Sequence, residues 1–327
     1  VSPVPRLLAE QGHEVHLACE QINKPVFDHN PHIQEWVETP PAHLWPEFEP
    51  TYNRLVAEYD KIYHAHGHVE VGLLYRTDVL WGSIPTSLQR REIAKGVSYQ
   101  DLTFEALGLT ERGVLPEFYF TPEEEASIKE LRNILDRDGK KLVVWQWEGS
   151  TQSKGLVWGP RYIRETLEKF PDTVHYVFTD SPNFKAQIPK DERVYDAMGH
   201  QTVRQSIMLT AAADLVIGPE SFLVNAAAAF DTPKIIFFSH SAPENLAKYY
   251  TNCYPIVPLP EVSCHPCYLI QVDFQRVYNP NKRGVCRQFE QACRVWDADY
   301  VYRSLGYKCC YHLPHEEVAE KIERVLG

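Results

Sequence analysis

The stretch Asp214-Leu-Val-Ile-Gly-Pro-Glu-Ser-Phe-Leu-Val-Asn-Ala-Ala-Ala-Ala-Phe-Asp-Thr-Pro-Lys-Ile-Ile-Phe-Phe-Ser239 decides the fold of this chain. Its two apolar runs predict strands, its Gly-Pro pair predicts a turn, and the Ala-rich segment 221–230 predicts a helix between the strands. This order places Gly218, Glu220, Ser221 and the free N–H groups of the helix at the carboxyl end of the first strand. Ligands of open α/β sheets bind at this edge, so we expect the functional site there.

Strand and helix patterns alternate along the rest of the chain, which favours parallel sheets covered by helices. Helices are expected at 43–59, 86–96, 101–109, 122–138, 162–170, 202–213, 244–250 and 314–326, and strands at 13–19, 33–37, 61–66, 141–147 and 174–179. A connection rich in Gly and Pro at 110–122 separates two blocks of this alternation. We therefore expect two α/β domains, 1–122 and 123–327, with a ligand cleft between them.

The beginning of the chain has a helix pattern without a strand before it. Residues 3–11 carry prolines near the first turn, and Gly12 is suited to end the helix. We therefore expect the first strand of the N-terminal domain to be missing from this sequence.

Composition indicates a globular protein. The chain has 327 residues, of which 44% are hydrophobic and 24% are charged, and its formal net charge is −11. No apolar run approaches the ~20 residues that a membrane-spanning helix needs, so we expect no integral membrane segment. The negative charge argues against broad binding of nucleic acid, although a local basic groove remains compatible with it. We expect a cytoplasmic protein.

The loop that follows the predicted strand 141–147 combines small, hydroxylic and basic residues. It reads Glu-Gly-Ser-Thr-Gln-Ser-Lys-Gly over 148–155. Backbone donors, the hydroxyls of Ser150 and Thr151 and the ammonium of Lys154 suit a phosphate group. The alternative is a solvated surface loop in which Lys154 is one of many exposed lysines. The loop lacks the Gly-x4-Gly-Lys-Ser/Thr spacing of a Walker A motif.

Together these motifs resemble those of the heptosyltransferase-like glycosyltransferases of family 9. The resemblance rests on the Gly-Ser-x3-Lys-x3-Trp loop, the helix 204–213, the block 218–233 and the opening segment 3–15. It implies a GT-B fold, with two Rossmann-like domains facing each other across a cleft. It also implies an acceptor-side N-terminal domain and a C-terminal domain that binds a nucleotide-diphosphate sugar.

The resemblance assigns roles to individual positions of this chain. Lys154, with Ser150 and Thr151, would hold the phosphates of the donor. Glu220 and Ser221 stand where the family has Asp-Ser, next to donor ribose and phosphate.

The same block also contains departures from the family pattern. Gly218 and Asn225 complete the expected donor site, but Asn225 replaces the usual His and Phe222 replaces the usual Gly. Donor identity or donor geometry would therefore differ from that of the heptose enzymes.

The candidate general base is His66, in the sequence His64-Ala-His-Gly-His68. The family's proposed base is an Asp that would precede Pro3, outside this sequence. A histidine near its free pKa is suited to remove a proton from a hydroxyl. The alternatives are that these histidines line a polar strand end or bind a metal ion.

Six of the eight cysteines lie between residues 264 and 310, a region we assign to a Cys-rich segment, 253–310, of the C-terminal domain. The spacing of Cys264, Cys267, Cys286 and Cys293 is compatible with a structural Zn²⁺ or iron–sulfur site. Local disulfides or buried free thiols are the alternatives.

The sequence therefore predicts a glycosyltransferase that transfers a sugar from a nucleotide-diphosphate donor to a glycan or another hydroxyl acceptor. Lys154 and the helix N-terminus would stabilise the departing diphosphate, so catalysis would require no metal or other cofactor. Two alternatives stay open: a non-catalytic protein of the same architecture that binds nucleotide or glycan, and a nucleotide-sugar epimerase.

Overall fold

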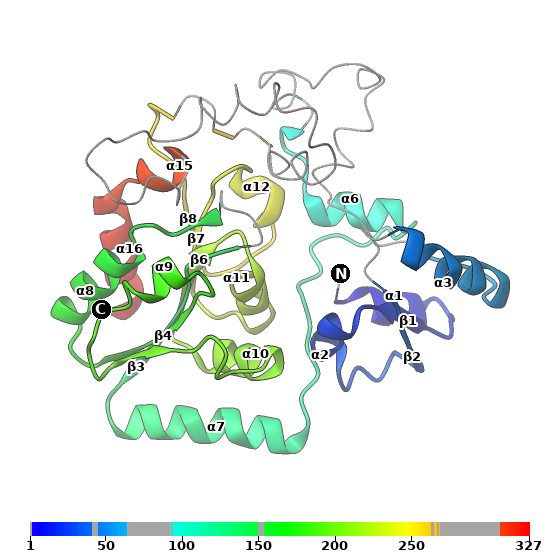
Figure 1. The fold of residues 1–327 in the computed structure, drawn as a ribbon, viewed down its shortest axis with the longest axis horizontal. Helices are drawn as coiled ribbons and strands as arrows, with labels where there is room; N and C mark the ends of the chain where they lie inside the picture. The colour runs from blue at the N-terminus through cyan, green and yellow to red at the C-terminus, as the bar shows by residue number, and fades with distance from the viewer. Residues whose placement is uncertain are drawn as a thin grey trace.

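The computed structural model describes residues 2–40, 45–63, 92, 94–149, 154–262, 265, 266, 268 and 308–327. Its main element is a six-stranded, fully parallel sheet with the strand order β5-β4-β3-β6-β7-β8 (Figure 1). The strands are β3 (Lys141–Gln146), β4 (Thr173–Phe178), β5 (Val194–Asp196), β6 (Leu215–Pro219), β7 (Lys234–Phe237) and β8 (Cys253–Ile256). A separate two-stranded parallel sheet pairs β1 (His16–Cys19) with β2 (Glu35–Glu38).

Helices cover both faces of the large sheet. One face packs against α8 (Gly159–Lys169) and α16 (His315–Leu326), which supply Tyr162, Ile163, Val318 and Ile322 to the core. The other face packs against α7 (Pro122–Arg137), α10 (Val203–Ala212) and α11 (Phe222–Ala227). Strand β3 is buried on both faces, which explains its nearly continuous apolar sequence. The result is a three-layer α/β/α unit.

The order of the strands creates a switch point between β3 and β6. The chain moves outward from β3 to β4 and β5, and then returns through α10 to place β6 on the other side of β3. Because all six strands are parallel, the loops that follow β3 and β6 leave from the same edge of the sheet, in the crevice where such sheets bind ligands.

The smaller unit packs the first helix, α1 (Val4–Glu10), near the two-stranded sheet (Figure 1). Its core joins Leu7 and Leu8 of α1 to Val15 and to Phe104 of α6 (Tyr99–Ala106). The remaining helices and 3-10 turns are η1 (Gln21–Asn23), α2 (Lys24–Phe27), α3 (Trp45–Glu58), α9 (Pro182–Lys185), η4 (Ala228–Phe230), α12 (Pro243–Leu246) and α15 (Lys308–Tyr311).

The connection between the two units ends at a capped helix. The Thr121 hydroxyl accepts from the Glu124 N–H at 3.2 Å, and the Glu124 carboxylate accepts from the Thr121 N–H at 2.9 Å. This capping box starts α7 as predicted. Glu124 also pairs with Arg204 of α10 at 2.6 Å. The division of the chain into domains at residue 122 stays a prediction.

Most predicted elements are present, but several predictions were wrong or incomplete. The strands β5 and β8 were not predicted, and the helix expected at 244–250 is the shorter α12. Both missed strands lie at the edges of the sheet and are short, and β8 contains Pro255, which lowers its strand signal. Of the strand expected at 61–66, residues 61–63 are irregular and the rest lie outside the described residues. Of the helix expected at 86–96, all but residues 92 and 94–96 lie outside the described residues.

A buried polar network crosses β3 and β4. The indole N–H of Trp145 donates to His175 Nδ1 at 2.9 Å, and the Thr173 hydroxyl lies 2.8 Å from His175 Nε2. Burial, with a smaller contribution from the charge of Arg193, lowers the pKa of His175 from 6.5 to about 3. The imidazole is therefore neutral in the folded protein at neutral pH.

His175 should make the protein less stable as the pH falls. The unfolded chain binds a proton at His175 below pH 6.5 whereas the folded chain does not, so acid favours unfolding between pH 6.5 and about 3. Within that range, this histidine should lower the free energy of unfolding by about 1.4 kcal/mol for each unit by which the pH falls. We expect the free energy of unfolding, measured with denaturant at pH 6.5, 5.5 and 5.0, to change less with pH in His175→Gln than in the unsubstituted protein. His200→Gln, at an exposed position, is the control, and an equal slope in His175→Gln would refute the assignment.

Candidate functional site

Gln146, the last residue of β3, connects the two strands of the switch point. Its side-chain amide donates to the Ser221 hydroxyl at 2.9 Å and accepts from the Leu223 N–H at 2.9 Å. The amide therefore holds the first turn of α11 against the end of β3. The sequence prediction did not include Gln146. The available signal was a polar residue at the carboxyl end of a buried strand.

Gly218 allows β6 to lie close to Gln146. A Cβ atom on Gly218 would lie 3.0 Å from the Gln146 carbonyl oxygen and 3.1 Å from its Cβ. Both neighbours belong to a buried, hydrogen-bonded strand, so neither has room to move. The absence of a side chain at Gly218 thus sets the spacing of the two strands at the site.

Lys154 is almost buried, with 9% of its surface exposed, and its side chain extends toward the end of β6. Its ammonium donates to the Glu220 carbonyl oxygen at 2.9 Å. The lysine side chain covers Gly149, where a Cβ would lie 2.7 Å from Lys154 Cβ and Cδ. An ammonium group has three N–H donors. Among the described residues, the Lys154 ammonium makes one hydrogen bond, and its acceptor is neutral. The loop therefore delivers a positive charge to the switch point.

The Glu220 carboxylate is buried among residues that follow β7. One oxygen lies 2.7 Å from His240 Nδ1 and accepts from the Ser239 hydroxyl at 3.2 Å. The other accepts from the Ser241 hydroxyl at 2.5 Å and from its N–H at 3.3 Å. Both oxygens are thus occupied by protein groups.

The pKa of Glu220 reports how strongly this cluster holds a negative charge. Burial alone would raise it, but the charges of His240 and Lys154 and the hydrogen bonds from His240 and Ser241 outweigh burial and lower it to about 2. The carboxylate is ionised at neutral pH, so the cluster is a fixed anchor between the ends of β6 and β7.

Asn225 lies on α11, one turn after Ser221. Its side-chain oxygen accepts from the Tyr250 hydroxyl at 3.0 Å. Phe222, the other position that departs from the family pattern, is half-buried and packs on the core that α11 covers.

No protein-family model matches the chain, and no curated protein sequence matches it. The structure of E. coli ADP-heptose lps heptosyltransferase II has a TM-score of 0.58 to the chain at 12% identity, covering 99% of this chain and 93% of that one. The chain has the GT-B fold of this heptosyltransferase. The predicted fold is thereby confirmed.

Two further structures have this GT-B fold. One is the dodecameric iron-containing heptosyltransferase TibC in complex with ADP-D-beta-D-heptose. It has a TM-score of 0.52 and 14% identity, and the match covers 99% of this chain and 72% of that one. The other is a family 9 glycosyl transferase from Veillonella parvula, with a TM-score of 0.50, 14% identity and coverage of 78% and 81%. The resemblance found in the sequence motifs therefore extends to the fold.

Within this GT-B fold, Lys154, Gly218, Glu220 and Ser221 gather at the switch point, and Asn225 lies one helical turn away. Other predicted site residues lie outside the described residues: Ser150, Thr151, His66 and the cysteines 264, 267, 286 and 293. Where the structure is described, no group of three or more His, Cys, Asp or Glu side chains could hold a metal ion, and nothing there supports a structural zinc.

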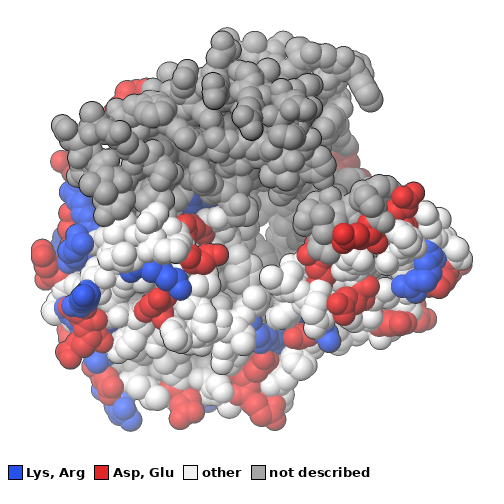
Figure 2. Space-filling view, in the orientation of Figure 1, with Lys and Arg blue, Asp and Glu red and all other residues white. Residues whose placement is uncertain are grey.

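Two properties of the described residues concern nucleic acid and membrane binding: the distribution of surface charge and the length and apolarity of the helices. In Figure 2, basic and acidic side chains are interspersed on the visible face, without a continuous basic stripe on its described part. This arrangement does not favour broad contact with a phosphate backbone. Across the same residues, no helix combines the length and apolarity required to cross a bilayer.

Proposed function

We propose that this chain is a glycosyltransferase that transfers a sugar from a nucleotide-diphosphate donor to an acceptor hydroxyl. The observation that carries the proposal is the buried Lys154 ammonium, held at the β3–β6 switch point beside the first turn of α11. A compact cation in a protected crevice is suited to a diphosphate. The GT-B fold supports the same assignment.

In this proposal, several residues around Lys154 bind different parts of the donor or hold those that do. Lys154 contacts the diphosphate, and Ser150 and Thr151 add hydroxyl donors from the same loop. Ser221, oriented by Gln146, adds a hydroxyl from the other side. Glu220 acts by position, because its carbonyl oxygen holds Lys154 and its carboxylate fixes the turn after β7.

The chemistry follows from these positions. His66 is the candidate base that removes the proton from the acceptor hydroxyl as its oxygen attacks the anomeric carbon. The bond from that carbon to the diphosphate breaks, and Lys154 stabilises the negative charge that develops on the leaving group. This scheme uses no metal ion, so transfer should persist in EDTA. A cytoplasmic location is part of this proposal.

A thermal-shift screen with nucleotide sugars tests the proposal. A donor that binds the native state must raise the melting temperature, by an amount that grows with its concentration relative to Kd. ADP-heptose is the first compound to test, because TibC, which shares the fold, was solved with that ligand. Incubation of the best ligand with and without a glycan acceptor then separates transfer from epimerisation. Failure of every nucleotide sugar to shift the melting temperature would refute the proposal.

Metal analysis of the purified protein tests the predicted thiolate site. Cys264, Cys267, Cys286 and Cys293 stay candidates for a closed four-thiolate site, which would be structural rather than catalytic. One neighbour with this fold is described as iron-containing, so iron and zinc should both be measured. We expect about one four-coordinate metal ion per chain. Absence of both metals, with free thiols in a titration, would remove this interpretation.

A further inference from the structure

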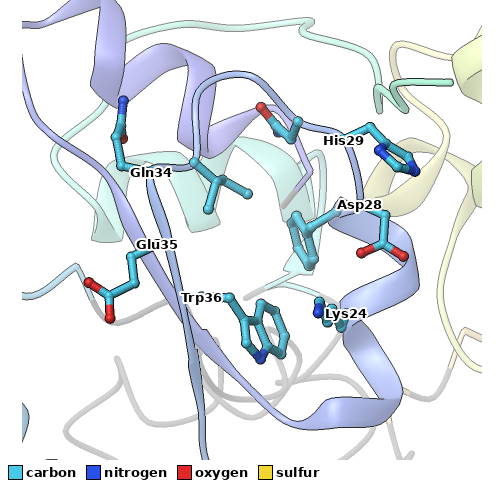
Figure 3. A pocket seen from close by; sticks show the side chains of 9 residues that line it. Lys24, Asp28, His29, Gln34, Glu35 and Trp36 are labelled. Atoms are coloured by element: carbon cyan, nitrogen blue, oxygen red, sulfur yellow. The ribbon is translucent and has the colours of Figure 1, made fainter. Parts of the chain in front are cut away.

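A pocket lies outside the switch point, in the smaller unit. It has a volume of about 230 Å³ and is lined by α2, by the turn that follows it and by the start of β2 (Figure 3). We propose that this pocket binds an uncharged sugar ring. We also propose that this sugar is part of the acceptor, which rests on the proposed glycosyltransferase function.

Aromatic and aliphatic side chains form the apolar part of the pocket. Phe27 of α2, Ile33 of the turn and Trp36 of β2 line it together. The Lys24 ammonium lies 5.9 Å from the centre of the Trp36 ring, at the outer limit of a cation–π contact, so it borders the ring face. The buried indole N–H of Trp36 has no hydrogen-bond partner among the described residues. The part of the ring that lines the pocket offers the C–H face of a sugar an apolar surface.

Polar side chains complete the lining and select against anionic ligands. Asp28 and Glu35 carry carboxylates, which accept hydrogen bonds from hydroxyl groups, and His29 adds ring nitrogens. Lys24 is the single Lys or Arg of the lining, against these two carboxylates. A phosphate or carboxylate on the ligand would therefore meet repulsion, whereas hydroxyls find both donors and acceptors. The volume lies below the range of pockets for drug-sized ligands and suits one small ring.

The position of the pocket suits an acceptor. Helix α2 packs against α10 of the large unit, as Figure 1 also shows. Arg204 in the first turn of α10 pairs with Glu124 of α7. That turn begins at the same edge of the sheet as the loops after β3 and β6, because α10 runs back to the start of β6. The pocket thus lies near the junction of the two units, because α2, which lines it, packs against α10.

Titration with simple sugars, in the absence of nucleotide, tests this inference. Saturation-transfer NMR with neutral methyl hexosides, and with glucose and mannose 6-phosphates as anionic counterparts, reports binding at millimolar concentration. We expect neutral glycosides to bind, and Trp36→Leu to weaken that binding at least ~10-fold because the stacking surface is lost. Asp28→Asn removes an acceptor charge and should weaken binding about 3-fold, in the range of one hydrogen bond. Asp60→Asn, at an exposed position outside the pocket, should bind as before.

Three outcomes would overturn the inference: no neutral glycoside binds, the two pocket substitutions leave binding unchanged, or the 6-phosphates bind more tightly. Asp28→Asn keeps the test decisive if Trp36→Leu fails to fold, since no hydrogen bond or ion pair of the Asp28 side chain is present within the described residues. Binding of a nucleoside diphosphate should be equal in all variants. In the unsubstituted protein, absence of sugar binding with normal nucleotide binding refutes the pocket alone, and sugar binding without nucleotide binding refutes the donor site alone.

Discussion

Replacement of Lys154 by alanine should reduce the rate of sugar transfer by about 10²–10³-fold, the effect of removing one donor that stabilises a developing negative charge. The ammonium is nearly buried, and its one described hydrogen bond goes to the neutral Glu220 carbonyl oxygen, while its charge also acts on the Glu220 carboxylate. That carboxylate is already held by His240 and Ser241, so the Lys154 charge can also act on a diphosphate, in a place that water screens poorly. Initial rates at saturating acceptor, together with the donor Kd from calorimetry, measure the effect.

Two further substitutions separate charge from geometry at this position. Lys154→Arg keeps the charge but replaces the compact ammonium by a planar guanidinium, so we expect an intermediate loss. Lys169→Ala removes an exposed lysine that pairs with Glu323 on the far helices, and transfer should be unaffected. Normal transfer or normal donor hydrolysis by Lys154→Ala would show that the donor phosphates bind elsewhere.

Gly159→Ala should destabilise the fold by roughly 3 kcal/mol, at the upper end of the effect of overpacking. Gly159 is the first residue of α8, and a Cβ there would lie 2.4 Å from Nε1 and 2.6 Å from Cε2 of Trp147. Trp147 is fully buried, so its ring has no free space to enter. Alanine gains about 1 kcal/mol of helix propensity over glycine, which is too little to offset the clash. Denaturant unfolding gives the difference directly.

A double-mutant cycle identifies the cause of this effect. Trp147→Phe removes the part of the indole that carries Nε1, an atom that has no hydrogen-bond partner among the described residues. Gly159→Ala should therefore cost much less in the Trp147→Phe background, with a coupling energy above about 1 kcal/mol. Equal costs in the two backgrounds would show that the glycine is needed for another reason.

The architecture of the large unit could be predicted because its elements have strong local signals. The apolar runs of β3, β6 and β7 and the capped start of α7 are visible in the sequence, and the alternation of helices and strands predicts a parallel sheet. Strands β5 and β8 were missed because short edge strands bury little apolar surface. Their positions are set by pairing with a neighbouring strand, which a local pattern does not encode.

The candidate site was predicted in part for a related reason. Lys154, Glu220 and Ser221 could be found because each lies in a loop or turn with a recognisable composition. Gln146 and the partners of Glu220 could not, because their contacts depend on which strands are neighbours. The pocket around Trp36 was missed for the same reason, since it forms only when α2 and β2 approach each other.

Hydrogen–deuterium exchange with a bound nucleoside diphosphate tests the central claim most directly. If the switch point is the donor site, the nucleotide should slow exchange in peptides that carry Lys154 and in peptides covering 219–226. It should leave peptides covering 24–36 unchanged. Slower exchange confined to regions other than the loops after β3 and β6, with binding confirmed by calorimetry, would contradict the account.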